Sequence, residues 1–175
     1  MKARNRRAFV GTFVVSAIVI SLSGCASAGD IARAEAIDDI EQRIAEYKTE
    51  YVQLLDSGEP TESLVQSALD GAVGVQVLDG LTSVELAELA GGPLTGVVSA
   101  SAKEAGLLTS VIVVSVQNSS AGMDYERASL YLCIDVFGEP GDAVEDLVLE
   151  DVACNSELDV ITDGMATEVH LADLN

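Results

Sequence analysis

The amino-acid sequence predicts an α+β fold with N-terminal helices packed on one face of an antiparallel sheet of about four to five strands, and with one disulfide. Three observations predict this class. Apolar residues recur at helical spacing within residues 30–90, alternating or β-branched segments follow from residue 94 onward, and two cysteines lie in this second part. Helices that precede strands in this way typically gather on one side of an antiparallel sheet.

Residues 1–24 have the layout of a secretory signal peptide. Four basic residues lie near the start, an apolar run of about 15 residues extends from Ala8 to Leu22, and small residues follow. A helix that crosses the hydrocarbon core of a membrane needs about 20 apolar residues, so this run is short for a stable span. The alternative is an uncleaved anchor.

The signal ends in Leu22-Ser23-Gly24-Cys25, which resembles the lipobox of bacterial lipoproteins. The resemblance implies that Cys25 receives a diacylglyceryl group and becomes the first residue of the mature protein. Two acyl chains are what stable anchoring requires, and a thiolate is the nucleophile that takes them up. We therefore expect a lipid-anchored protein on the outer face of the cytoplasmic membrane.

The export route has two candidates. Arg6-Arg7-Ala8-Phe9 partly resembles a twin-arginine signal, whereas the strong hydrophobicity of the run that follows favours the general secretory route. The chain also resembles small lipoproteins of high-GC Gram-positive bacteria, which share a lipobox, a low lysine content, an acidic mature region and one cysteine pair.

The 151 residues after the signal fit one domain, with a short tether at 25–29 and a single α+β domain at 30–175. This domain begins with a long amphipathic helix over residues 30–56, which Gly58 and Pro60 end. Its apolar stripe suits a short coiled-coil seam or a face that covers a sheet, and only about two and a half heptads are present, which favours the sheet. The stripe consists of Ile37, Ile40, Ile44, Tyr47, Tyr51 and Leu54.

Shorter elements are expected up to residue 90. Residues 61–70 read as a second helix and residues 73–77 as a short strand. Thr82 and Glu85 fit a capping box, which predicts a third helix that ends near Ala90.

The second half reads as strands. We expect strands at 94–100, 107–117 and 126–137, a polar loop at 118–124, a turn at 138–142, an apolar segment at 147–152 and a last strand at 166–171. Alternation over 126–137 puts Leu130, Leu132, Ile134 and Val136 on one face and Tyr131, Cys133, Asp135 and Phe137 on the other.

Cys133 and Cys154 form an even pair in an oxidising compartment, which predicts a disulfide. A reactive or metal-binding thiol pair is the alternative, but no Cys-x-x-Cys spacing or nearby histidine supports it. A tight hairpin about Pro140 would bring residue 147 opposite Cys133. The disulfide with Cys154 therefore requires that the segment between residues 138 and 153 contain an excursion of additional residues, or that this segment belong to a different strand pairing.

Charge excludes one class of partner. After the signal, five basic and 29 acidic residues remain, a net charge of about −24, so no cationic patch is available for nucleic acid. The acidic surface suits solubility, a divalent cation or a basic protein partner. Scarce aromatics disfavour stacking on sugars.

Catalytic patterns are weak, and the sequence predicts no cofactor and no metal site. His170 is the one histidine, no Gly-x-Ser-x-Gly elbow is present, and the many carboxylates single out no acid–nucleophile pair. Our leading hypothesis is a non-enzymatic binding or envelope-associated module, and the alternative is a hydrolase that acts on a cell-wall or extracellular substrate through carboxylates. A two-lobed solute-binding lipoprotein needs a longer chain.

Overall fold

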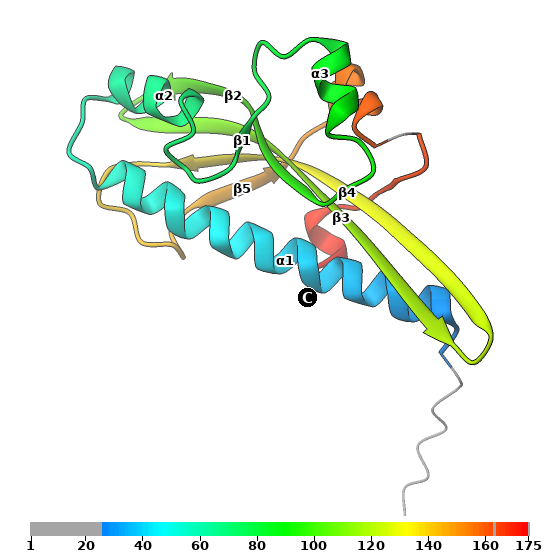
Figure 1. Cartoon of the computed structure of the whole chain (residues 1–175). Coiled ribbons are helices and arrows are strands. Elements are labelled where there is room, and N and C mark those ends of the chain that lie inside the picture. Colours follow the sequence, from blue (N-terminus) through cyan, green and yellow to red (C-terminus); the bar gives the residue numbers. More distant parts are fainter. Residues whose placement is uncertain (1–25, 163, 175) are drawn as a thin grey trace, which may run out of the picture.

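The computed structural model describes residues 26–162 and 164–174, in which helices lie on both faces of one mixed sheet (Figure 1). The α+β prediction is confirmed. The helices are α1 (Ala28–Leu55), α2 (Thr61–Leu69) and α3 (Ser83–Glu88), with short 3-10 turns η1 (Ser156–Val160) and η2 (Leu171–Asp173). The strands are β1 (Gln76–Val77), β2 (Leu94–Lys103), β3 (Gly106–Ala121), β4 (Asp124–Gly138), β5 (Val148–Asp151) and β6 (Thr167–Glu168).

The sheet has the order β1-β2-β3-β4-β5, and β6 pairs with β4 as well. Strands β2 to β5 pair antiparallel, as predicted, whereas the two-residue strands β1 and β6 pair parallel with β2 and β4. The segments predicted as strands at 73–77 and 166–171 are therefore mostly irregular. Each contributes only two residues to the sheet, because each lies at its edge and follows a turn.

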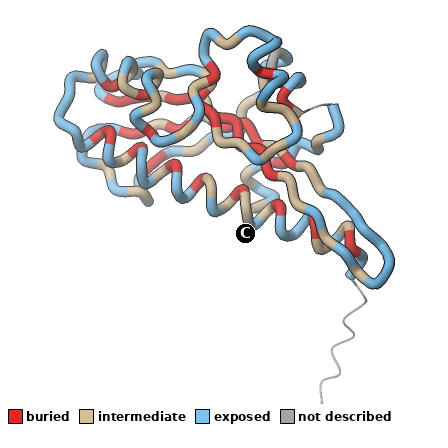
Figure 2. Tube along the Cα trace, viewed as in Figure 1, coloured by how far each residue is buried: buried red, intermediate tan, exposed pale blue. Residues whose placement is uncertain are grey.

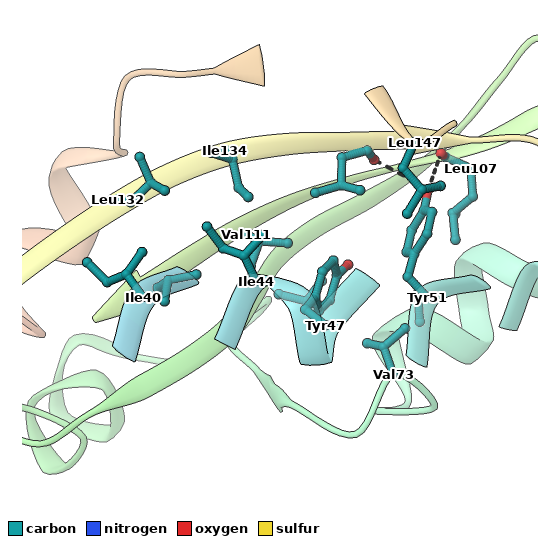
Figure 3. Packing of buried hydrophobic residues seen from close by; sticks show 14 of the residues in the cluster. Ile40, Ile44, Tyr47, Tyr51, Val73, Leu107, Val111, Leu132, Ile134 and Leu147 are labelled. Atoms are coloured by element: carbon teal, nitrogen blue, oxygen red, sulfur yellow. Dashed lines mark hydrogen bonds between the residues drawn. The ribbon is translucent and has the colours of Figure 1, made fainter. Parts of the chain in front are cut away.

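Helix α1 covers one face of β3 and β4, so its apolar stripe packs within the molecule (Figures 1 and 3). It begins at Ala28, two residues before the predicted start, because the Ser27 hydroxyl accepts from the Asp30 amide and the Asp30 carboxylate accepts from the Ser27 amide. The Ser27 hydroxyl also donates to the Asp30 carboxylate at 2.8 Å, and this bond, together with the one from the Ser27 amide, lowers the pKa of Asp30. In the described chain no helix is long and apolar enough to cross a bilayer.

The main core lies between the sheet and the helices α1 and α2, and its buried residues line the inner sides of these elements (Figure 2). Leu130, Leu132, Ile134 and Val136 all belong to it, which confirms the predicted inward face of β4. A smaller core lies on the opposite face, where Leu86 of α3 and Leu158 of η1 pack against Ile112 and Cys133. Helix α3 is thus separated from α1 and α2 by the sheet, so the expectation that the helices pack on one face holds for α1 and α2 and is wrong for α3.

Two tyrosines of α1 join the helix to the strands through polar contacts inside the core (Figure 3). The Tyr47 hydroxyl lies 2.7 Å from Thr109 Oγ1. The Tyr51 hydroxyl donates to the carbonyl oxygens of Leu107 and Val136. Both tyrosines are at most 1 % exposed. Burial raises the pKa of each hydroxyl, so both hydroxyls stay neutral. Their hydrogen-bonding groups are satisfied by the strand partners.

The polar loop predicted at 118–124 is wrong, because β3 and β4 form one long hairpin with one-to-one register up to Ala121 and Asp124. Only Gly122 and Met123 form the turn, and the φ of +68° at Gly122 is the backbone that a Gly-x hairpin turn requires. Small polar residues are typical of loops, but both faces of this end of the hairpin are in contact with solvent. Polar side chains are therefore compatible with strand pairing here.

The disulfide between Cys133 and Cys154 is confirmed, with a Cα–Cα distance of 5.4 Å. The excursion that it requires is residues 139–147, since β5 pairs Val148 with Phe137 and Asp151 with Ile134. The amide of Val152 still donates to the carbonyl of Cys133, and Cys154 lies two residues further along. The bridge therefore fastens the segment after β5 back onto β4.

Candidate ligand cleft

A cleft of about 600 Å³ lies on the sheet face opposite α1, next to the smaller core. Its floor comes from β2, β3 and β4, one wall from the loop before α3, and the other from the segment that the disulfide fastens. The lining residues are Leu78, Asp79, Gly80, Leu81, Leu86, Val98, Ser99, Ser110, Val111, Cys133, Asp135, Val152, Ala153, Cys154, Asn155 and Leu158.

The polar centre of the floor is a cross-strand pair. Ser110 of β3 and Asp135 of β4 are register partners, and the Ser110 hydroxyl donates to Asp135 Oδ1 at 2.6 Å. Both residues are half-buried. Because this bond leaves the second carboxylate oxygen of Asp135 available, the pair can present a negatively charged acceptor to a ligand.

A bulge in β2 shapes the edge of the floor. The register between β2 and β3 shifts between Val97 and Ser99, so Val98 is the extra residue. The consecutive residues Val98 and Ser99 both line the cleft, although neighbours in a regular strand point to opposite faces. The bulge therefore adds a hydroxyl beside an apolar side chain.

Local interactions hold both walls in place. Thr82 and Glu85 make the predicted capping box at the start of α3, with the Thr82 amide donating to Glu85 Oε2 at 2.8 Å. Backbone and hydroxyl bonds from Thr82 lower the pKa of Glu85. The opposite wall is held by the Cys133–Cys154 bridge. The cleft is thus built into the folded chain, as is usual for ligand sites.

The lining combines aliphatic side chains with polar ones in similar measure, and the polar side chains are those of Asp79, Ser99, Ser110, Asp135 and Asn155. No lysine or arginine is among the described lining residues. Two carboxylates without a cation favour a ligand that is neutral or positively charged, and the leucines and valines favour one with an apolar part.

The residues singled out by sequence have different places. Cys25 lies outside the described residues. Cys133 and Cys154 line the cleft. His170 does not, since it lies near the chain end with Nδ1 3.9 Å from Asp151 Oδ1. Within residues 26–162 and 164–174, no group of three metal-ligating side chains is found.

Sequence reasoning missed Asp79, Ser110 and Asp135 as site residues. One signal pointed to Asp135, since it is the one charged residue in the apolar part of β4 and the alternation placed it on the same face as Cys133. Ser110 follows from it as its strand partner, but only once the register is known.

Comparison with known proteins gives no relative from which a role could be transferred. No protein-family model, no curated protein and no solved structure matches this chain.

Proposed function

We propose that the chain is a membrane-anchored extracytoplasmic lipoprotein, held by lipid on Cys25, and that it binds an envelope component in the cleft opposite α1 without catalysing a reaction. The lipobox-like ending Leu22-Ser23-Gly24-Cys25 supports the anchor. The observation that carries the binding function is the cleft itself, which is preformed, lined by polar and apolar groups in similar measure, and acidic at Asp79 and the Ser110–Asp135 pair.

The ligand class follows from the lining. A cationic or neutral molecule with an aliphatic portion fits two carboxylates set among leucines and valines, and an anionic ligand is repelled by them. A basic segment of a protein partner that ends in an apolar side chain has the same chemistry. The net charge of the mature chain, about −24, attracts such ligands from a distance.

A test uses two amphiphiles of equal chain length, dodecyltrimethylammonium and dodecyl sulfate, titrated below their micellar concentrations and followed by calorimetry. We expect wild type to bind the cation and not the anion. Asp135→Asn preserves the shape and the Ser110 bond but removes the charge, and Ser99→Trp fills the cleft from the edge of its floor, so both should weaken cation binding. Asp38→Asn, an exposed acid on α1, is the matched control. Equal affinities in all four proteins would reject the cleft as the site.

A hydrolase is the second candidate, because two carboxylates, Asp79 and Asp135, line the same cleft. A glycosidase needs one carboxyl group as proton donor and the other as base or nucleophile. Incubation with cell-wall polymer separates the two functions. Release of fragments by wild type that is lost in both Asp79→Asn and Asp135→Asn would favour the hydrolase over the binding module.

The anchor has its own test. Intact-mass spectrometry of protein extracted from membranes should show a chain that begins at Cys25 and carries a diacylglyceryl adduct. A different amino terminus, or no adduct, would contradict the proposal.

A further inference from the structure

We infer that the tip of the β3–β4 hairpin, residues 118–125, is a second contact with the lipid surface, beside the lipid on Cys25. This inference rests on the proposed anchoring function. It adds a protein surface that touches the bilayer and so sets how the domain is oriented on it.

Position is the first argument. The hairpin tip and the first turn of α1 lie at the same end of the molecule (Figure 1). A Cβ atom placed on Gly29 would lie 3.9 Å from Cγ of Glu126, just below the tip. Only two residue steps separate Cys25 from Ser27, and a chain of that length spans at most about 7 Å. A lipid on Cys25 therefore brings the membrane surface to the end of the molecule that the hairpin occupies.

The second argument is the chemistry of the tip. Met123 is fully exposed and Tyr125 is 69 % exposed, so two large side chains with apolar parts face the solvent. Residues 117–121 of β3 and the turn residue Gly122 carry no charge. Tyrosine is enriched where protein meets the headgroup layer of a membrane, because its ring is apolar and its hydroxyl stays hydrated.

Charge limits how deep the contact goes. Asp124 and Glu126 lie on the face of β4 that α1 covers, and Tyr125 lies on the other face. Carboxylates do not enter the hydrocarbon, so the contact is shallow and lies at headgroup level. For the same reason the contact should be weaker on vesicles that contain anionic phosphatidylglycerol than on zwitterionic ones, and high salt should reduce this difference.

Two contacts orient the domain where a lipid alone would let it turn freely. Along β3, the cleft residue Ser110 is eleven residues from Ala121, which corresponds to about 36 Å of strand. A hairpin that touches the bilayer at its tip therefore points the cleft away from the membrane, where envelope ligands have access to it.

The experiment uses the absence of tryptophan from the whole sequence. Met123→Trp creates a single tryptophan at the tip. Val84→Trp creates one on α3, at a position that is 71 % exposed and belongs to the far side of the sheet, and serves as the matched control. Each full-length lipidated protein is purified from membranes and reconstituted into phosphatidylcholine vesicles with or without brominated acyl chains.

We expect the tip tryptophan to shift its emission to shorter wavelength on the vesicles, and the brominated lipid to quench it at least about twofold more than the α3 tryptophan. Equal emission and equal quenching at the two positions, in protein whose mass shows the diacylglyceryl adduct, would overturn the hairpin contact and leave the anchor intact. Protein without the adduct would overturn the anchor and, with it, this inference, so the mass of the same sample distinguishes the two failures.

Discussion

The buried tyrosines of α1 predict a specific loss of stability at alkaline pH. Because burial raises the pKa of Tyr47 and Tyr51, the folded protein keeps both hydroxyl protons where the unfolded chain, with ordinary tyrosine pKa values near 10, releases them. Stability is therefore unaffected well below pH 10 and decreases as the pH rises above it.

The magnitude follows from this difference in bound protons. Between pH 9 and pH 11 each tyrosine that stays protonated in the folded state removes about 1.4 kcal/mol, and the pair removes about 2.7 kcal/mol. That is a large part of the roughly 5–15 kcal/mol that holds a domain of this size together. Burial also raises the pKa of Tyr131, so its contribution has the same sign.

The assay is urea unfolding at pH 9, 10 and 11, followed by far-UV circular dichroism. Tyr47→Phe and Tyr51→Phe each lower stability at every pH, because they remove a buried hydrogen-bonding group, so only the change between pH 9 and 11 is compared. Each variant should lose about 1.4 kcal/mol less than wild type over this interval. Identical losses in wild type and both variants would refute the assignment of these tyrosines as the alkaline-sensitive groups.

Three further predictions concern the walls and the sheet. Gly138→Ala should cost about 1–3 kcal/mol in urea unfolding, because the added Cβ would lie 2.5 Å from a buried leucine side chain, whereas Gly92→Ala, which meets no atom within 4 Å, should be near neutral. Replacing both Cys133 and Cys154 by alanine should cost about 3 kcal/mol, as expected for a crosslink that closes a loop of this length, and unchanged thermal unfolding would contradict this. Thr82→Ala should lower stability by about 0.5–2 kcal/mol at pH 7 through loss of the α3 cap. Because bonds from Thr82 lower the pKa of Glu85, this loss of stability should become smaller as the Glu85 carboxylate is protonated in acid. An equal loss at pH 7 and pH 3 would contradict the role of that carboxylate.

Side-chain periodicity explains how much of the fold could be predicted. Alternation along β4 placed Ile134 in the main core and Cys133 on the opposite face, and the helical stripe placed Tyr47 and Tyr51 against the sheet. These predictions succeeded because burial on one face leaves a regular pattern in the sequence.

The cleft could not be predicted in the same way. It depends on the bulge at Val98, on the residue of β3 that pairs with Asp135, and on the extra residues 139–147 between β4 and β5. Each of these is set by the pairing register between segments that are distant in sequence, which the side-chain pattern of one strand does not determine. The end of the hairpin was mistaken for a loop because its small polar residues are typical of both. The proposed anchor at Cys25 follows from the lipobox-like ending of the signal.

The row of alanines on α1 has a mechanical consequence. Ala28, Ala32 and Ala36 follow one another at intervals of four residues and are at most 2 % exposed, so one methyl group per turn separates the helix from what it touches. The helix is about 42 Å long, and its tyrosine end is fastened to the strands by hydrogen bonds. A bulkier residue such as leucine at position 32 should therefore push the N-terminal end of α1 away from the hairpin that it contacts, while the tyrosine end stays bonded to the strands.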